Sequence, residues 1–90
     1  MDQQEFAKQL ALEAYDEVLT KSLPAKQWIP EHSHLFDAKV LVLSGDVTLG
    51  LEGRQTVYRE GDIYSVGRGI EHTELYGDAG VSLMIGRNNH

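Results

Sequence analysis

The chain contains no cysteine among its 90 residues, which excludes both a disulfide framework and a metal site built on thiolates. Any metal ligands must therefore be imidazole or carboxylate groups. The sequence also lacks an apolar run near the roughly 20 residues that span a bilayer, and residues 1–5 lack the basic and apolar segments of a secretory signal. We therefore expect a cytoplasmic protein with no membrane partner.

Basic residues are scarce: 8 Lys and Arg face 14 Asp and Glu, which gives a formal net charge of −6. No cluster of Lys and Arg interrupts this acidity, and an acidic surface repels phosphate backbones, so we expect no nucleic-acid partner. The length predicts a single domain over residues 1–90. Such a small domain has a thin core, which a bound metal or a second subunit would stabilise.

The N-terminal residues 1–15 contain one predicted helix, over residues 3–14. Phe6 and Leu10 are four residues apart and lie on one helical face. Asp2 is in the position of an N-cap, with Glu5 three residues later as in a capping box. A helix of this length is marginal alone, so we expect it to pack on the rest of the chain.

Residues 16–87 have the pattern of an antiparallel β-barrel or sandwich, because short apolar runs alternate with turns that contain glycine. No second helix separates the strands, which argues against a parallel α/β sheet. Val40, Val42, Val47 and Leu49 are predicted core residues. The expected strands cover residues 18–24, 39–44, 47–51, 55–59, 63–66, 72–76 and 81–85.

The run from Val40 to Leu43 is apolar at every position, so both faces of that strand need cover. The N-terminal helix with the first strand would provide it, and so would a second subunit. We therefore expect a homodimer.

Three of the four histidines form a constellation. His32 and His34 are two residues apart on an extended segment, so their imidazoles point to the same side. His72 ends the pattern Gly61-x5-Gly67-x-Gly69-x2-His72, where a hairpin brings in a third imidazole. Three neutral imidazoles suit a divalent transition metal such as Zn, Fe, Mn, Ni or Cu. An isolated His-x-His more often marks ordinary surface histidines, and the glycine pattern reverses that balance. His90, the last residue, is assigned to a free tail.

These spacings resemble the two motifs of the cupin family, G-x5-H-x-H-x3,4-E-x6-G and G-x5-P-x-G-x2-H-x3-N. The first motif matches at the His32 and His34 pair followed by Gly45, and the second at Gly61, Gly69 and His72. The resemblance covers residues 28–86. It implies an all-β fold, the antiparallel double-stranded β-helix or jelly-roll barrel, and a metal ion on His32, His34 and His72.

Three positions depart from the family pattern. The family's glutamate, proline and asparagine are replaced by Ala38, Gly67 and Tyr76. The lost glutamate leaves either a site of three histidines or one in which another carboxylate is the fourth ligand. Glu74 is the first candidate because it shares a strand face with His72. Asp37, one residue from the family position, is the second, and for each an ordinary solvated carboxylate is the alternative.

Aromatic residues are candidates for the wall of a pocket that holds one small ligand. Tyr76 is favoured because it is four residues from His72 on the same strand face. Arg68, in the turn before His72, is a candidate partner for an anionic substrate, with a solvated arginine as the alternative. The other aromatic candidates, for which core packing is the alternative, are Trp28, Phe36, Tyr58 and Tyr64.

The resemblance implies several functions, since the family includes dioxygenases, sugar isomerases and epimerases, decarboxylases and storage proteins. We therefore expect a metal-dependent enzyme of dioxygenase or isomerase type that acts on a small organic molecule. The alternatives are a non-catalytic barrel that binds a sugar or organic acid as a sensor, and a metal-free structural barrel. Fold alone does not decide between them.

Overall fold

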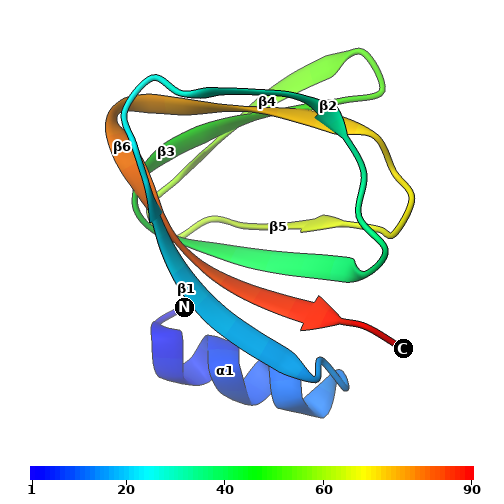
Figure 1. The fold of residues 1–90 in the computed structure, drawn as a ribbon. Coiled ribbons are helices and arrows are strands. Elements are labelled where there is room, and N and C mark those ends of the chain that lie inside the picture. The colour runs from blue at the N-terminus through cyan, green and yellow to red at the C-terminus, as the bar shows by residue number, and fades with distance from the viewer.

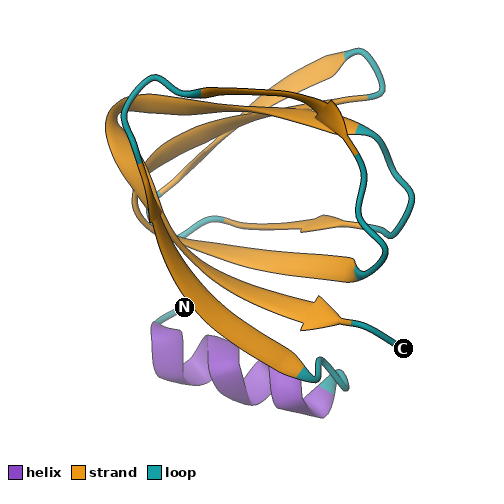
Figure 2. Cartoon of the chain, in the orientation of Figure 1, coloured by secondary structure: helices purple, strands orange, loops and turns teal.

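The computed structural model describes all 90 residues and shows an antiparallel β-barrel with one helix packed outside it (Figures 1 and 2). The predicted all-β class with a short N-terminal helix is confirmed. No helix is both long and apolar enough to cross a lipid bilayer. The elements are α1 (Gln3–Leu12), β1 (Glu17–Leu23), β2 (Trp28–His32), β3 (Asp37–Leu51), β4 (Arg54–Arg59), β5 (Ile63–Val66) and β6 (His72–Asn88).

Two long strands, β3 and β6, pair with each other along most of their length and take part in both sides of the barrel. The half of β3 that contains Ala38 also pairs with β5, and the half of β6 that contains Arg87 also pairs with β1. At the other end, the half of β3 that contains Leu49 pairs with β4, and the half of β6 that contains Glu74 pairs with β2. All pairs are antiparallel. Strands that bend from one sheet into the next in this way close a barrel around a single interior.

The breaks predicted between residues 39–44 and 47–51, and between residues 72–76 and 81–85, are wrong. Residues 39–44 and 47–51 belong to the single strand β3, and residues 72–76 and 81–85 to the single strand β6. Residues 77–80 of β6 lie opposite the one β3 residue Asp46, which is a large bulge. Gly45 and Gly80 have positive φ, of 74° and 77°, so these glycines bend the strands without reversing the chain.

Other local predictions are confirmed with small changes. The Asp2 side chain accepts a 2.8 Å hydrogen bond from the Glu5 amide, so Asp2 is the N-cap of α1. The helix ends at Leu12, two residues early, and β2 is an additional strand. The Glu52-Gly53 pair has φ of 52° and 79° and forms the two-residue turn between β3 and β4.

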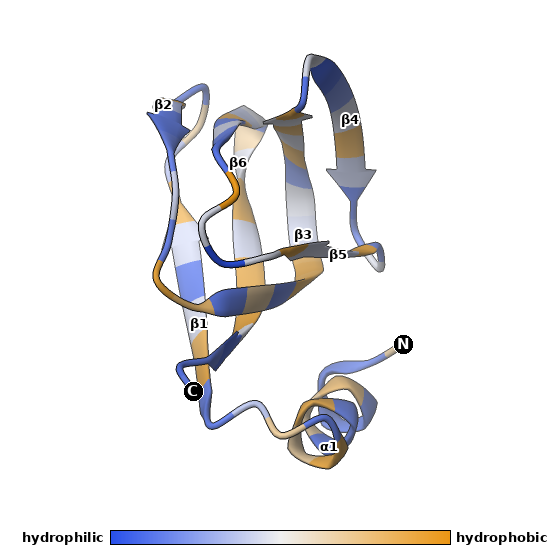
Figure 3. Ribbon diagram, turned by 90° about the vertical axis from the view of Figure 1, so that its right-hand side faces the viewer, coloured by the Kyte–Doolittle hydropathy of each residue, from blue (hydrophilic) through white to orange (hydrophobic).

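Hydrophobic and hydrophilic residues follow one another in short bands along the strands (Figure 3), and the alternating burial of β3 separates an interior core from the outer face. The predicted core residues Val40, Val42, Val47 and Leu49 are all buried inside the barrel. On the outer face, Leu41 is covered by Phe6 and Leu10 of α1. The helix thus covers the second apolar face of β3 at Leu41, so this face does not require a second subunit. A homodimer and a cytoplasmic location stay predictions, the first testable by sedimentation at micromolar concentration.

Gly86 of β6 permits the close approach of α1. A Cβ atom added there would lie 2.5 Å from Cδ2 of Leu10, which is fully buried. We expect Gly86→Ala to lower the free energy of unfolding by about 1–2 kcal/mol, because the Leu10 side chain must leave its position. Urea denaturation measures the change. An unchanged midpoint would show that Leu10 rearranges without cost and would contradict the prediction.

Candidate metal centre

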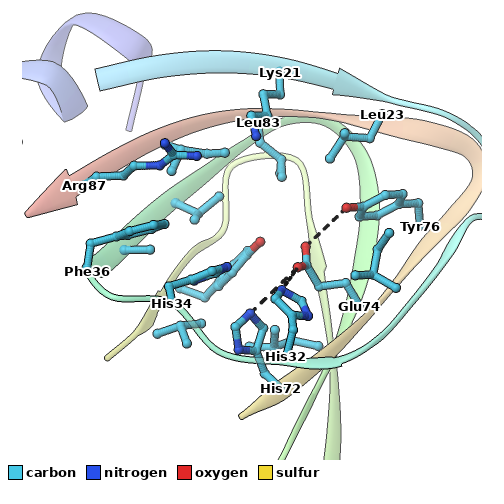
Figure 4. A pocket seen from close by; sticks show the side chains of 17 residues that line it. Lys21, Leu23, His32, His34, Phe36, His72, Glu74, Tyr76, Leu83 and Arg87 are labelled. Atoms are coloured by element: carbon cyan, nitrogen blue, oxygen red, sulfur yellow. Dashed lines mark hydrogen bonds and ion pairs between the residues drawn. The ribbon is translucent and has the colours of Figure 1, made fainter. Parts of the chain in front are cut away.

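Three histidines from two separate segments meet inside the barrel (Figure 4). His32 ends β2 and lies directly opposite His72 at the start of β6, while His34 follows β2 in the loop to β3. Ring centroids are 4.2 Å apart for His32 and His72, 5.0 Å for His32 and His34, and 4.8 Å for His34 and His72. One nitrogen from each ring lies within 4.8 Å of the others, so the group could hold a metal ion.

The glycine motif before His72 fixes its loop against the His34 loop. Gly69, with φ of 75°, donates its amide hydrogen to the His34 carbonyl at 2.8 Å. A side chain is strained at this φ, which explains why glycine suits the position. Gly69, one of the glycines whose spacing predicted the third histidine, therefore holds the two histidine loops together.

Backbone carbonyls orient two of the imidazoles. The Nδ1 atoms of His32 and His72 lie 2.8 and 3.0 Å from the carbonyl oxygens of Pro30 and Ile70, two residues earlier in each case. Since a carbonyl only accepts hydrogen bonds, we assign the proton of each neutral ring to Nδ1. The Nε2 lone pairs then remain free, which is the usual arrangement around histidine metal ligands.

His34 supplies the observation that tests whether a cation fits. Its Nδ1 atom is buried and has no hydrogen-bond partner, while its ring stacks on Phe36 with centroids 4.6 Å apart. Burial, then the neighbouring His72 and His32, lower the pKa of His34 to about 4. A neutral ring with an unpartnered buried nitrogen beside two other imidazoles fits a metal ion.

This shift makes the metal-free protein sensitive to acid. As the pH falls, His34 in the unfolded chain takes up a proton around its pKa of 6.5. In the folded protein the same ring takes up a proton only near pH 4. Stability is therefore fully present above pH 6.5 and is lost as the pH falls toward 4. We expect a loss of about 2 kcal/mol, allowing for partial exposure of the ring. Thermal unfolding at pH 8 to 4 measures it, and His34→Gln, unlike His90→Gln, should flatten the profile.

Glu74 adds a carboxylate to the histidine group. Its Oε2 atom lies 3.4 Å from Nε2 of His32 and 3.8 Å from Nε2 of His72. Its Oε1 atom accepts a 3.4 Å hydrogen bond from the Tyr76 hydroxyl. Burial and the Glu74 charge raise the pKa of Tyr76 to about 12, so this hydroxyl stays a donor at neutral pH. The first candidate for a fourth ligand is thus beside the histidines and fixed by Tyr76.

Asp37 and Arg68 lie outside this group and bind each other. Asp37 Oδ1 accepts the Arg68 amide hydrogen at 2.8 Å, and this bond lowers the Asp37 pKa. The Arg68 guanidinium also donates to the carbonyl oxygens of Asn88 and His90, so it fastens the C-terminal residues instead of lining the cavity. His90 is thereby held at its backbone, while its ring lies near Asp16, away from the other histidines.

The histidines and Glu74 form part of the wall of a cavity of about 230 Å³ (Figure 4). Phe36, Tyr64 and Tyr76 line it. Tyr58 packs on Tyr64 behind the wall, with centroids 4.8 Å apart. Trp28 is 52% exposed and does not line the cavity, because it pairs with Leu75 on the outer face while Ile29 turns inward. The remaining lining residues are Lys21, Leu23, Ile29, Ala38, Val40, Leu49, Val66, Leu83, Ile85 and Arg87.

Sequence reasoning missed the two cationic residues of this wall, Lys21 and Arg87. Lys21 stands between Leu19 and Leu23, which share its strand face, so a lysine on a predicted inward face was the available signal. Arg87 lay beyond the last predicted strand, residues 81–85, and β6 extends to Asn88.

Neither a family sequence model nor a curated protein sequence matches this chain. A protein of unknown function from Rhizobium leguminosarum superposes on 81% of this chain with a TM-score of 0.76 at 16% identity, and the match covers 69% of that protein. An RmlC-like cupin from Shewanella frigidimarina superposes on 78% with a TM-score of 0.67 at 16% identity, covering 63% of that cupin.

A third similar structure is the DMSP lyase DddQ from Ruegeria pomeroyi, which superposes on 80% of this chain with a TM-score of 0.69 at 22% identity. The chain spans only 38% of that enzyme, so it is much shorter. These likenesses establish the architecture that the resemblance to the cupin family implied. The chain has the fold of the cupin superfamily.

Proposed function

We propose that the protein binds one divalent transition-metal ion on His32, His34 and His72, with Glu74 as the fourth ligand. The observation that supports this is the group of three histidine nitrogens, one from each ring, that lie no more than 4.8 Å apart, and the buried Nδ1 of His34 also has no hydrogen-bond partner. Nitrogen and oxygen donors of this kind suit Zn, Fe, Mn, Ni or Cu. In the family pattern a glutamate on β3, at the position of Ala38, carries the negative charge. In this chain Glu74 on β6 supplies that charge instead.

We further propose that this centre serves a metal-dependent enzyme of dioxygenase or isomerase type that acts on a small organic molecule. A bound divalent ion would supply Lewis-acid activation of a coordinated group. Apolar side chains form most of the cavity wall, and Tyr76 holds the Glu74 carboxylate by a hydrogen bond at Oε1. A barrel that only captures a small molecule would use the same cavity, so turnover separates the two functions.

Metal analysis tests the first proposal. Purified protein, loaded in turn with Zn²⁺, Mn²⁺, Ni²⁺, Cu²⁺ and anaerobic Fe²⁺, should retain one ion per chain after dialysis, as measured by elemental analysis. His32→Ala and His72→Ala should each lose the ion, whereas His90→Ala, outside the group, should keep it. Circular dichroism verifies that each variant is folded. Full metal content in a folded His72→Ala variant would remove this histidine from the site.

Activity screening tests the second proposal. Each reconstituted form should be assayed for oxygen uptake with small diketones, phenols and thiols, and for isomerisation of small sugars. Turnover that disappears in His32→Ala supports an enzyme. Tight ligand binding without turnover in any metal form would support the capture function instead.

A further inference from the structure

The side of the cavity facing the histidine group is cationic (Figure 4). Lys21 lies on β1 opposite Leu83 of β6, and Arg87 lies on β6 between Glu17 of β1 and Ala38 of β3. Because alternate residues of a strand share a face, Lys21 points inward with Leu19 and Leu23. Two adjacent strands therefore place one ammonium and one guanidinium group at the same cavity.

Neither cation is fully satisfied by the protein. None of the ion pairs in the structure includes Lys21, and the buried Nε of Arg87 has no hydrogen-bond partner. Glu17 lies near Arg87, with Oε1 3.7 Å from Nη1, and is too distant for a hydrogen bond. The Lys21 ammonium and the Nη groups of Arg87, which form no hydrogen bond with the protein, are therefore the donors available for a ligand.

Arg87 is nevertheless held in place. Its guanidinium carbon lies 4.7 Å from the centroid of Phe36, and Phe36 stacks on His34. This stack, of cation on aromatic ring on imidazole, fixes the distance between Arg87 and the histidine group. A ligand that reaches both ends therefore meets preorganised partners.

Charge distinguishes the cavity from the rest of the molecule. The chain has a net charge of −6, whereas the charged residues of the lining are two cations, Lys21 and Arg87, and one anion, Glu74. With neutral histidines the cavity wall is thus positive, and a bound divalent cation would make it more so. Opposite charge in a low-dielectric cleft attracts an anionic ligand.

We propose that Lys21 and Arg87 form a subsite for the carboxylate of a small organic acid whose other end reaches the histidine group. This inference rests on the proposed metal centre, because that centre gives the far end of the ligand its partner. The planar guanidinium matches a carboxylate, and the nearby Glu17 leaves one uncompensated cation, which suits a monoanion better than a phosphate dianion. Since an engineered cavity of about 150 Å³ holds benzene, this cavity of about 230 Å³ admits an acid with a short apolar body.

The test compares two probes of equal shape and different charge, benzoate and benzamide. Titrations followed by NMR use metal-free protein, so that no carboxylate can coordinate a metal, and are repeated on Zn²⁺-loaded protein. Benzoate should bind at least about tenfold more tightly than benzamide and shift amides of β1 and β6 near residues 21 and 87. Phenyl phosphate should bind less tightly than benzoate.

Variants assign the effect to the two cations. Lys21→Met, at an exposed position on the cavity mouth, and Arg87→Met should each weaken benzoate about tenfold and leave benzamide unchanged. Lys21→Arg keeps the charge and should keep most of the affinity. Lys8→Met, an exposed lysine on α1, gives the same change in net charge and should have no effect.

The outcomes separate this inference from the metal centre. Lys21→Met should retain one metal ion per chain, whereas His72→Ala should lose the ion and keep benzoate binding that depends on Lys21. Equal affinity for benzoate and benzamide, or benzoate binding unaffected by Lys21→Met, overturns the subsite while leaving the metal centre intact. Absence of benzoate binding in both metal states, or tighter binding of phenyl phosphate than of benzoate, also overturns it.

Discussion

Replacing Glu74 with glutamine is expected to lower the affinity for a divalent transition metal about 100-fold at pH 7. The amide keeps the size of the side chain but removes its negative charge, and Oε2 of Glu74 lies 3.4 and 3.8 Å from the Nε2 atoms of His32 and His72. Glu74 is also the only anion of the cavity lining, so no neighbouring carboxylate compensates for its loss. Competition with a chromogenic chelator measures the affinity.

Asp37→Asn is the matched control, because it neutralises the other candidate for the fourth ligand. Asp37 is bound to Arg68 and lies outside the histidine group, so metal affinity should stay within about twofold of the wild-type value. Glu74→Gln with wild-type affinity would leave a site of three histidines. A large loss in Asp37→Asn instead would show that the loop rearranges and that Asp37 is the ligand.

The side chains that meet at the site could be predicted from the sequence, because residues two apart on an extended segment point to the same side. His32 and His34 share a side as residues two apart do, and Glu74 and Tyr76 share the inward face of His72 for the same reason. The orientation of Trp28 could not be predicted from the sequence. A register shift between Ile29 and His32 changes the alternation, so Trp28, four residues before His32, faces outward. Alternation predicts a face only as far as the next bulge.

The course of the long strands could not be predicted for a related reason. Glycine at positive φ occurs both where a hairpin reverses and where a strand bends, and the local sequence is similar in the two cases. Gly53 belongs to a hairpin turn, whereas Gly45, with nearly the same φ, bends β3. The difference lies in the partner: Gly45 faces the backbone of β6 at Gly80, which is 35 residues away in the sequence and outside any local pattern.

We expect the second large effect at the contact between Gly45 and Gly80, where it is an effect on stability. Gly45→Ala should lower the free energy of unfolding by at least about 3 kcal/mol. Part of this loss is the strain of alanine at a φ of 74°, and part is the clash of its Cβ, which would lie 2.1 Å from the Gly80 carbonyl oxygen. The opposing atom belongs to the backbone, so the bend of both β3 and β6 must shift. Guanidinium denaturation followed by circular dichroism measures the loss.

Gly53→Ala separates strain from contact. Gly53 has a φ of 79°, yet a Cβ there would meet nothing within 4 Å, so only the conformational cost of about 1 kcal/mol applies. The difference between the two variants, about 2 kcal/mol, then measures how rigidly β3 and β6 are held together at the bend. Equal losses would mean that the bend relaxes freely. Because the bend joins the part of the sheet that carries His72 and Glu74 to the part that carries Lys21 and Arg87, such freedom would also leave the two ends of the cavity without a fixed separation.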